Sequence, residues 1–126
     1  MAGLKYFCTT NIPITITAGV KERVPINVIS LIFNIAFQNA AVIRSVKQNV
    51  DYFQVINVEY VDEPDNKGYS IRIMQENPFF EMEYFMEDEE GIEFNGKLYL
   101  IESWNGKTEN LAPDDHYITL LFPEEY

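Results

Sequence analysis

Apolar and polar residues alternate along most of the second half of the chain. The runs Tyr52–Val61, Tyr69–Gln75 and Phe80–Tyr84 show this pattern, and a shorter apolar run, Tyr117–Phe122, lies near the end. Successive side chains of a strand point to opposite faces of a sheet, and β-branched and aromatic residues dominate these runs. The pattern therefore predicts β-strands at all four places.

Two turn sequences separate these runs. Ile92–Phe94 and Lys97–Ile101 flank Asn95-Gly96, a dipeptide that tight hairpins favour, so a hairpin is predicted there. Asp62–Gly68 has the composition of a turn and also an outline of a cation-binding loop. Pro64 and Lys67 interrupt the alternating oxygen ligands of a calcium loop, which favours a plain hairpin loop.

The first residues predict shorter extended pieces. Leu4–Thr9 and Ile12–Ile16 have strand composition, and Pro13 confines the second piece to a sheet edge or a strand end. Gly19 is then expected to mark a turn.

A long helical pattern follows, from about Pro25 to Lys47. Proline suits the first position of a helix because its missing N–H has no partner there. Polar or small residues recur at steps of three and four and fall in one narrow arc: Asn27, Ser30, Asn34, Gln38, Ala41 and Ser45. The rest of the circumference is apolar, which predicts a central helix that strands cover on more than one side. A second interpretation is that Phe33 or Phe37 contacts a second subunit.

The expected fold is α+β, a single domain over residues 1–126. One principal apolar helix packs on an antiparallel sheet of five or six strands. The length of 126 residues and the hydrophobic fraction of 47% both suit one folded domain.

Few residues carry chemistry typical of an enzyme. Cys8 is the single cysteine, His116 is the single histidine, and the six glycines never cluster into a phosphate-binding loop. Cys8 is expected to be a core residue and His116 a solvated loop or strand-start residue, with a ligand or base as its alternative role. We therefore expect no enzyme, no cofactor and no metal site.

The expected location is the cytoplasm. The first residues do not have the pattern of a signal peptide. The longest apolar run, Val28–Phe37, is shorter than the roughly 20 residues needed to cross a bilayer.

Charge is distributed very unevenly within the net charge of −11. Residues 1–50 hold five bases and one acid, whereas residues 51–126 hold four bases and nineteen acids. The acidic part should repel nucleic acid and anionic membranes, so neither is expected to bind directly. The expected partner is a protein with a basic surface.

The densest acids form a series with no base among them. Its members are Glu81, Glu83, Glu87, Asp88, Glu89, Glu90 and Glu93. One interpretation is a solvated sheet face and loop that keep the protein soluble and protect a sheet edge. The other is a row of negative charge that presents itself to a basic nucleic-acid-binding groove.

Several short motifs resemble a small family from Gram-positive bacteria and their mobile elements. They are Thr17–Val20 with Val24-Pro25, the apolar helix, Asp51–Val55, Gln75–Pro78 and the ending from His116 to Tyr126. The family is catalogued as domain of unknown function nine-sixty. The resemblance covers most of the chain and implies a small cytoplasmic accessory protein, without catalytic or binding residues.

The sequence thus favours a non-enzymatic acidic interaction protein. Its most concrete form is a phage or mobile-element inhibitor of the DNA-mimic type, such as an anti-CRISPR or anti-restriction protein, with the acid series as its partner-binding residues. The alternative is a housekeeping binding module or small homodimer that acts through the apolar helix or aromatic strand faces. A hydrolase that uses carboxylates and a metal is a weaker third hypothesis.

Overall fold

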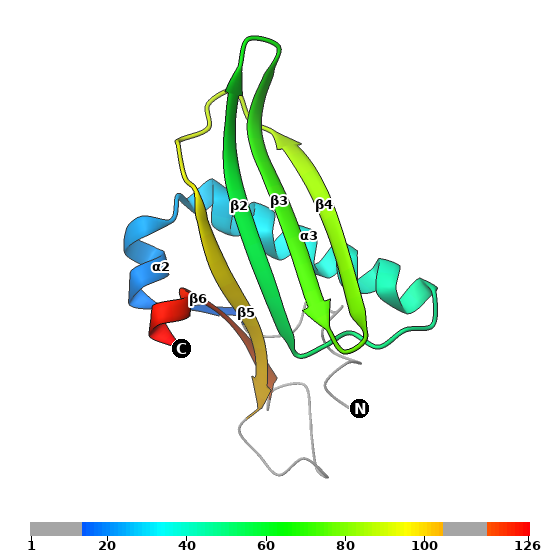
Figure 1. The fold of residues 1–126 in the computed structure, drawn as a ribbon. Helices are drawn as coiled ribbons and strands as arrows, with labels where there is room; N and C mark the ends of the chain where they lie inside the picture. Colours follow the sequence, from blue (N-terminus) through cyan, green and yellow to red (C-terminus); the bar gives the residue numbers. More distant parts are fainter. Residues whose placement is uncertain (1–13, 105–115) are drawn as a thin grey trace.

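A six-stranded sheet with one long helix on one face forms the protein (Figure 1). This computed structural model describes residues 14–104 and 116–126. The elements are β1 (Ile14–Ile16), α2 (Ala18–Arg23), α3 (Ile26–Ser45), β2 (Phe53–Glu63), β3 (Asn66–Glu76), β4 (Phe79–Glu87), β5 (Gly96–Trp104), β6 (His116–Leu121) and the 3₁₀ helix η3 (Pro123–Glu125). The predicted α+β architecture is confirmed.

The strands lie in the order β1-β6-β5-β2-β3-β4. Four of the five neighbouring pairs are antiparallel, and β1 pairs with β6 in parallel at one edge. The prediction was an antiparallel sheet, and among the described strands the parallel pair of β1 with β6 is the one departure from it. Strands β2, β3 and β4 follow each other as two hairpins, after which the chain crosses the end of the sheet and returns as β5 on the other side of β2.

The core lies between α3 and one face of the sheet. Alternate strand residues point into it, among them Ile56 on β2, Ile71 on β3, Leu98 on β5 and Leu120 on β6, all fully buried. The helix contributes a buried set of its own: Val28, Ile29, Ile32, Phe33, Ile35, Ala36, Asn39, Ala40 and Ile43. Burial of this apolar area supplies most of the free energy that holds the helix to the sheet.

The predicted polar arc of the helix is confirmed, because Ser30, Asn34 and Gln38 are exposed. The prediction that strands cover the helix on more than one side is wrong. All six strands belong to one sheet, and the helix lies behind it (Figure 1). Within the described residues, no helix covers the opposite face of this sheet. Part of its apolar circumference remains outside the core, since Ile26 and Val42 are exposed.

By length and composition alone, an 18-residue apolar segment of α3 would also suffice to cross a bilayer. The expectation drawn from Val28–Phe37 considered too short a segment. Half of this segment is buried within the protein, and a helix in the core of a protein can have the same length and composition.

The predicted hairpin at Asn95-Gly96 is wrong. Residues 92–94 form no strand, and Lys97–Ile101 belongs to β5, which pairs with β2 and β6. The cause is a buried side chain, that of Tyr69. Its hydroxyl accepts a hydrogen bond from the Ile92 N–H (2.9 Å) and donates one to the Ile92 carbonyl (2.8 Å), so this backbone is not available for a strand ladder.

The start of the described chain also differs from the prediction. Gly19 lies in helix α2 instead of a turn, since Thr17 caps this helix and its hydroxyl accepts a hydrogen bond from the Val20 N–H. Val20 is fully buried and ties α2 to the core. The predicted strand Leu4–Thr9, and Cys8 within it, lie outside the described residues.

The Tyr69→Phe variant tests the link between core and loop. Loss of the hydroxyl leaves both Ile92 backbone groups without their partner, so the free energy of unfolding should fall by about 1–3 kcal/mol. Exchange of the Ile92 amide hydrogen should become faster. Tyr84→Phe is the matched control, because its hydroxyl bonds to Asn39 (3.0 Å) away from this loop. Equal Ile92 exchange in both variants would show that Tyr69 does not hold the loop.

Candidate functional site

Strand β4 places the first part of the acid series on one face. Glu81, Glu83 and Glu87 are exposed and alternate with the half-buried residues Met82 and Met86. The half-buried residues pack against the core on the α3 side, so the three carboxylates lie on the helix-free side of the sheet.

A base on the neighbouring strand partly neutralises these carboxylates. The register sets Arg72 of β3 opposite Glu83, and the guanidinium contacts Glu83 at 3.0 Å and Glu81 at 3.8 Å. The expectation that no base balances the series is therefore wrong for these two residues. All three side chains are about half exposed, so the pairs contribute little to stability.

Asp88 has a structural role. One carboxylate oxygen accepts a hydrogen bond from the Asn27 amide of α3 (2.6 Å), and the other accepts one from the Glu90 N–H (3.1 Å). The Asp88 N–H donates to the Lys67 carbonyl of β3 (2.9 Å). Asp88 thus fixes the start of the segment between β4 and β5 and is only half exposed itself.

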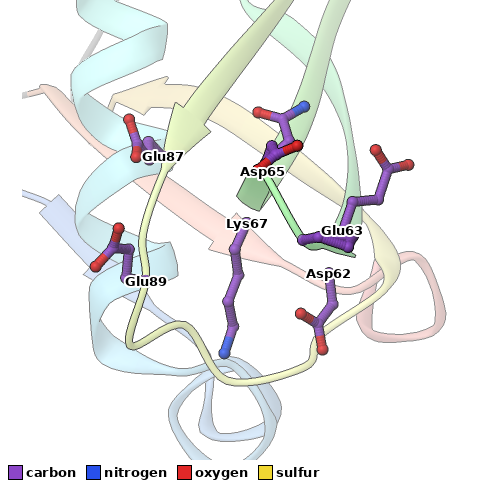
Figure 2. Close-up of a pocket in the computed structure, with 8 residues that line it drawn as sticks. Asp62, Glu63, Asp65, Lys67, Glu87 and Glu89 are labelled. Atoms are coloured by element: carbon purple, nitrogen blue, oxygen red, sulfur yellow. The ribbon is translucent and has the colours of Figure 1, made fainter.

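The strongest gathering of charge lies where the β2–β3 hairpin tip meets the end of β4. Five carboxylates line a hollow of about 660 Å³ there and are called the acidic end: Asp62, Glu63, Asp65, Glu87 and Glu89. Figure 2 shows Glu87 and Glu89 on one side of the Lys67 side chain and Asp62 and Glu63 on the other. Among the described residues, Lys67 is the single base that lines this hollow.

Three members of the acidic end were not among the predicted site residues. Asp62, Glu63 and Asp65 were read only as part of a hairpin loop. The signal in the sequence was the order of three consecutive strand patterns, since consecutive strands usually pair as neighbours. In the structure β3 pairs with both β2 and β4 and thereby brings their ends together. The register indeed places Gly68 opposite both Val61 and Glu87. The remaining predicted residues, Glu90 and Glu93, are exposed on the segment that follows β4.

The acidic end is an open surface of carboxylates. Within the described residues, no group of three or more acidic, histidine or cysteine side chains could hold a metal ion. What the arrangement offers chemically is a negative potential supplied by two loops, one anchored by Asp88 and the other by the long β2–β3 ladder.

The predicted dimer contacts differ in accessibility. Phe33 is only 6% exposed within a single chain, whereas Phe37 is half-buried. Both line a hollow of about 460 Å³ together with Ile14, Ile16 and Ile29. Phe33 therefore offers little surface to a second subunit.

An aromatic cluster on the helix-free face was missed by the sequence analysis. The Phe53 ring lies 4.8 Å from Tyr99 and 5.6 Å from Tyr126, and Tyr126 lies 5.9 Å from Tyr99, all between ring centroids. The Tyr126 ring comes from the end of the chain and packs there because η3 turns back beside β5. No local sequence pattern predicts that contact.

One acidic residue is buried instead of exposed. Glu102 on β5 is 2% exposed, and neither of its carboxylate oxygens has a hydrogen-bond partner in the described part of the chain. The side-chain oxygen of Gln54, one diagonal position away on β2, is also unpartnered. Burial raises the pKa of Glu102 to about 7. Glu102 lines neither of the two hollows described above.

Two residues with candidate chemistry stay untested. His116 begins β6, and its side chain lies outside the described part of the structure. Cys8 lies outside the described residues altogether.

The comparisons with known proteins concern the fold. No protein-family model matches the chain, and no curated protein matches it either. The structure is similar to that of a protein of unknown function from Enterococcus faecalis, with a TM-score of 0.66 and 16% sequence identity over 94% of each chain. An identity this low shows a shared fold and nothing about shared activity.

Glu102 predicts a specific pH dependence of stability. The pKa of Glu102 is about 7 in the folded state and near its ordinary value of 4.5 in the unfolded state, so the folded state binds the extra proton between these pH values. Stability should therefore fall as pH rises from 4.5 to 7 and stay lower above that, by up to about 3 kcal/mol.

The Glu102→Gln variant should lack this contribution. Relative to wild type, its free energy of unfolding should increase between pH 4.5 and pH 8 in urea titrations. Glu93→Gln, at an exposed position, should show a constant difference. A constant difference for Glu102→Gln would contradict a buried neutral carboxyl group.

Proposed function

We propose that this protein is a non-enzymatic, acidic interaction protein that presents the acidic end to a basic nucleic-acid-binding site on a partner protein. The observation that supports it best is the gathering of five carboxylates around one lysine at the meeting point of two loops. The most concrete form is a DNA-mimic inhibitor from a phage or mobile element, of the anti-CRISPR or anti-restriction type.

The charge balance supports this choice of partner. The whole chain carries a net charge of −11, and nineteen of its twenty acids follow residue 50. A partner that normally binds nucleic acid holds lysines and arginines that neutralise phosphates, and this contact releases the counterions condensed on the nucleic acid. The acidic end offers five carboxylates to the same lysines and arginines and would compete with nucleic acid for the groove.

The surroundings of the acidic end support binding as a preformed surface. Asp88 links the loop after β4 to α3, and the buried Tyr69 holds Ile92 in the same loop through both backbone groups. The hairpin tip continues a ladder of paired residues from Val55 to Glu63. A backbone that is held in one conformation keeps these carboxylates within one region, which favours recognition of a fixed set of bases.

Neutral variants separate the acidic end from total charge. Asp62→Asn, Glu87→Gln and Glu89→Gln together remove three charges from the acidic end. Glu22→Gln, Glu59→Gln and Glu76→Gln remove three exposed charges elsewhere and serve as the matched control. Asp88 is left intact in both because it holds the loop together.

The measurement begins with a partner captured on the immobilised protein from a nuclease-treated bacterial lysate. With the purified partner, the acidic-end variant should bind about tenfold or more weakly and with a smaller dependence on salt, while the control variant stays close to wild type. A short DNA duplex should displace the protein. Equal losses in both variants, or a complex that DNA does not displace, would contradict the proposal.

The aromatic cluster favours the alternative, a binding module or homodimer. Phe53, Tyr99 and Tyr126 lie on a face that no described helix covers, and Tyr126 is strongly exposed. If Tyr126→Ala abolishes binding of the captured partner and the acidic-end variant does not, the alternative replaces the first proposal.

A further inference from the structure

Strand β4 forms a long, regular edge of the sheet. It ends the strand order, and all nine of its residues pair with β3 without a break from Gly68–Glu87 to Glu76–Phe79. On its other side, no described residue pairs with it. The edge therefore presents a row of backbone N–H and C=O groups of the kind that accepts another strand.

The edge lacks two of the devices that usually prevent such pairing, proline and a bulge. No proline lies within Phe79–Glu87, and the register shows no bulge. Its charges all lie on one face, which Glu81, Glu83 and Glu87 share with Phe79 and Phe85. These two phenylalanines are 66% and 41% exposed.

The other face of β4 is apolar and incompletely covered. Phe80, Met82, Tyr84 and Met86 pack against the core, yet each remains only half-buried. An added strand with apolar residues on this face would extend the core sideways. On the opposite face it would meet carboxylates and phenylalanine rings.

Charge decides which strand fits. Three glutamates share the helix-free face of β4. Among the described residues, Arg72 is the single base that forms ion pairs there, with Glu81 and Glu83. Two copies of β4 paired edge to edge would bring six glutamates together on one face of two neighbouring strands. Like charges on neighbouring strands are destabilising. Lysine or arginine at alternate positions would instead pair with the carboxylates and stack on Phe79 or Phe85.

We infer that the edge of β4 is a docking site for an extended segment of a partner protein in which basic and apolar residues alternate. This inference rests on the proposed function and specifies how the partner binds. The added strand would run alongside β4 and end beside Glu87, which belongs to the acidic end. The same partner can therefore contact both.

The test uses two nine-residue peptides of identical composition with the full chain. In the first, lysine alternates with valine or threonine; in the second, the lysines are contiguous. The alternating peptide should bind at least about tenfold more tightly. It should also slow hydrogen exchange of β4 amides and give backbone contacts to β4 in nuclear magnetic resonance spectra.

Two further measurements separate strand pairing from charge attraction. N-methylation of the alternating peptide, on the backbone edge that faces β4, keeps its charge and should abolish binding. Glu81→Gln with Glu83→Gln should weaken the alternating peptide about fivefold or more, whereas Asp62→Asn with Glu89→Gln should change it less than twofold. These four side chains are exposed, so the variants should remain folded.

Equal binding of both peptides with spectral changes confined to the acidic end would overturn strand docking and leave the proposed function intact. Absence of binding by either peptide, or β4 amides already protected in the free protein, would also overturn it. Concentration-dependent pairing of β4 between two copies would identify a different occupant and overturn it as well. Peptide binding at β4 together with a partner that ignores the acidic-end variant would support the inference and contradict the proposed function.

Discussion

The packing of α3 on one face of the sheet is the contact on which the other features depend. Fully buried residues of the helix, such as Val28 and Ile32, belong to the same core cluster as Ile56 and Leu98 from the strands. Because the core is built on one face of the sheet, the sheet has two unlike faces. The helix-free face is left to carry the carboxylates of β4 and the aromatic cluster, both at a distance from the core.

The acidic end follows from the position of β3. This strand pairs with β2 on one side and β4 on the other, so the loops at the ends of its neighbours converge. Acids that are more than twenty positions apart in the chain, such as Asp62 and Glu89, then line the same hollow. The same pairing places Arg72 against Glu81 and Glu83 and leaves the larger excess of negative charge at the end of the strand.

Much of this fold was predictable because period-two alternation and the polar arc of the helix are local properties. The positions of β2, β3 and the helix were predicted to within a few residues. The hairpin at Asn95-Gly96 failed because Tyr69, more than twenty residues away, occupies the Ile92 backbone. Strand order, the parallel β1–β6 pair and the Tyr126 ring contacts all depend on distant parts of the chain, which a local pattern does not contain.

The candidate site was predictable only in part for the same reason. Charge counting found the acid series but gave no strand register, so it missed the partial neutralisation by Arg72 and the contribution of the hairpin tip. Asp88 was grouped with the contact residues because its sequence neighbours are acidic. Its bond to Asn27 shows that it also supports the fold from within.

The Tyr69 hydroxyl has a consequence for the thermodynamics of association. A loop that becomes ordered only on binding loses conformational entropy at that moment, at about 1–2 kcal/mol for each residue fixed. Here the loop after β4 is held before any partner arrives, by one phenol that bonds both backbone groups of Ile92. That entropy is lost during folding, so the association itself can retain more of the free energy of each contact.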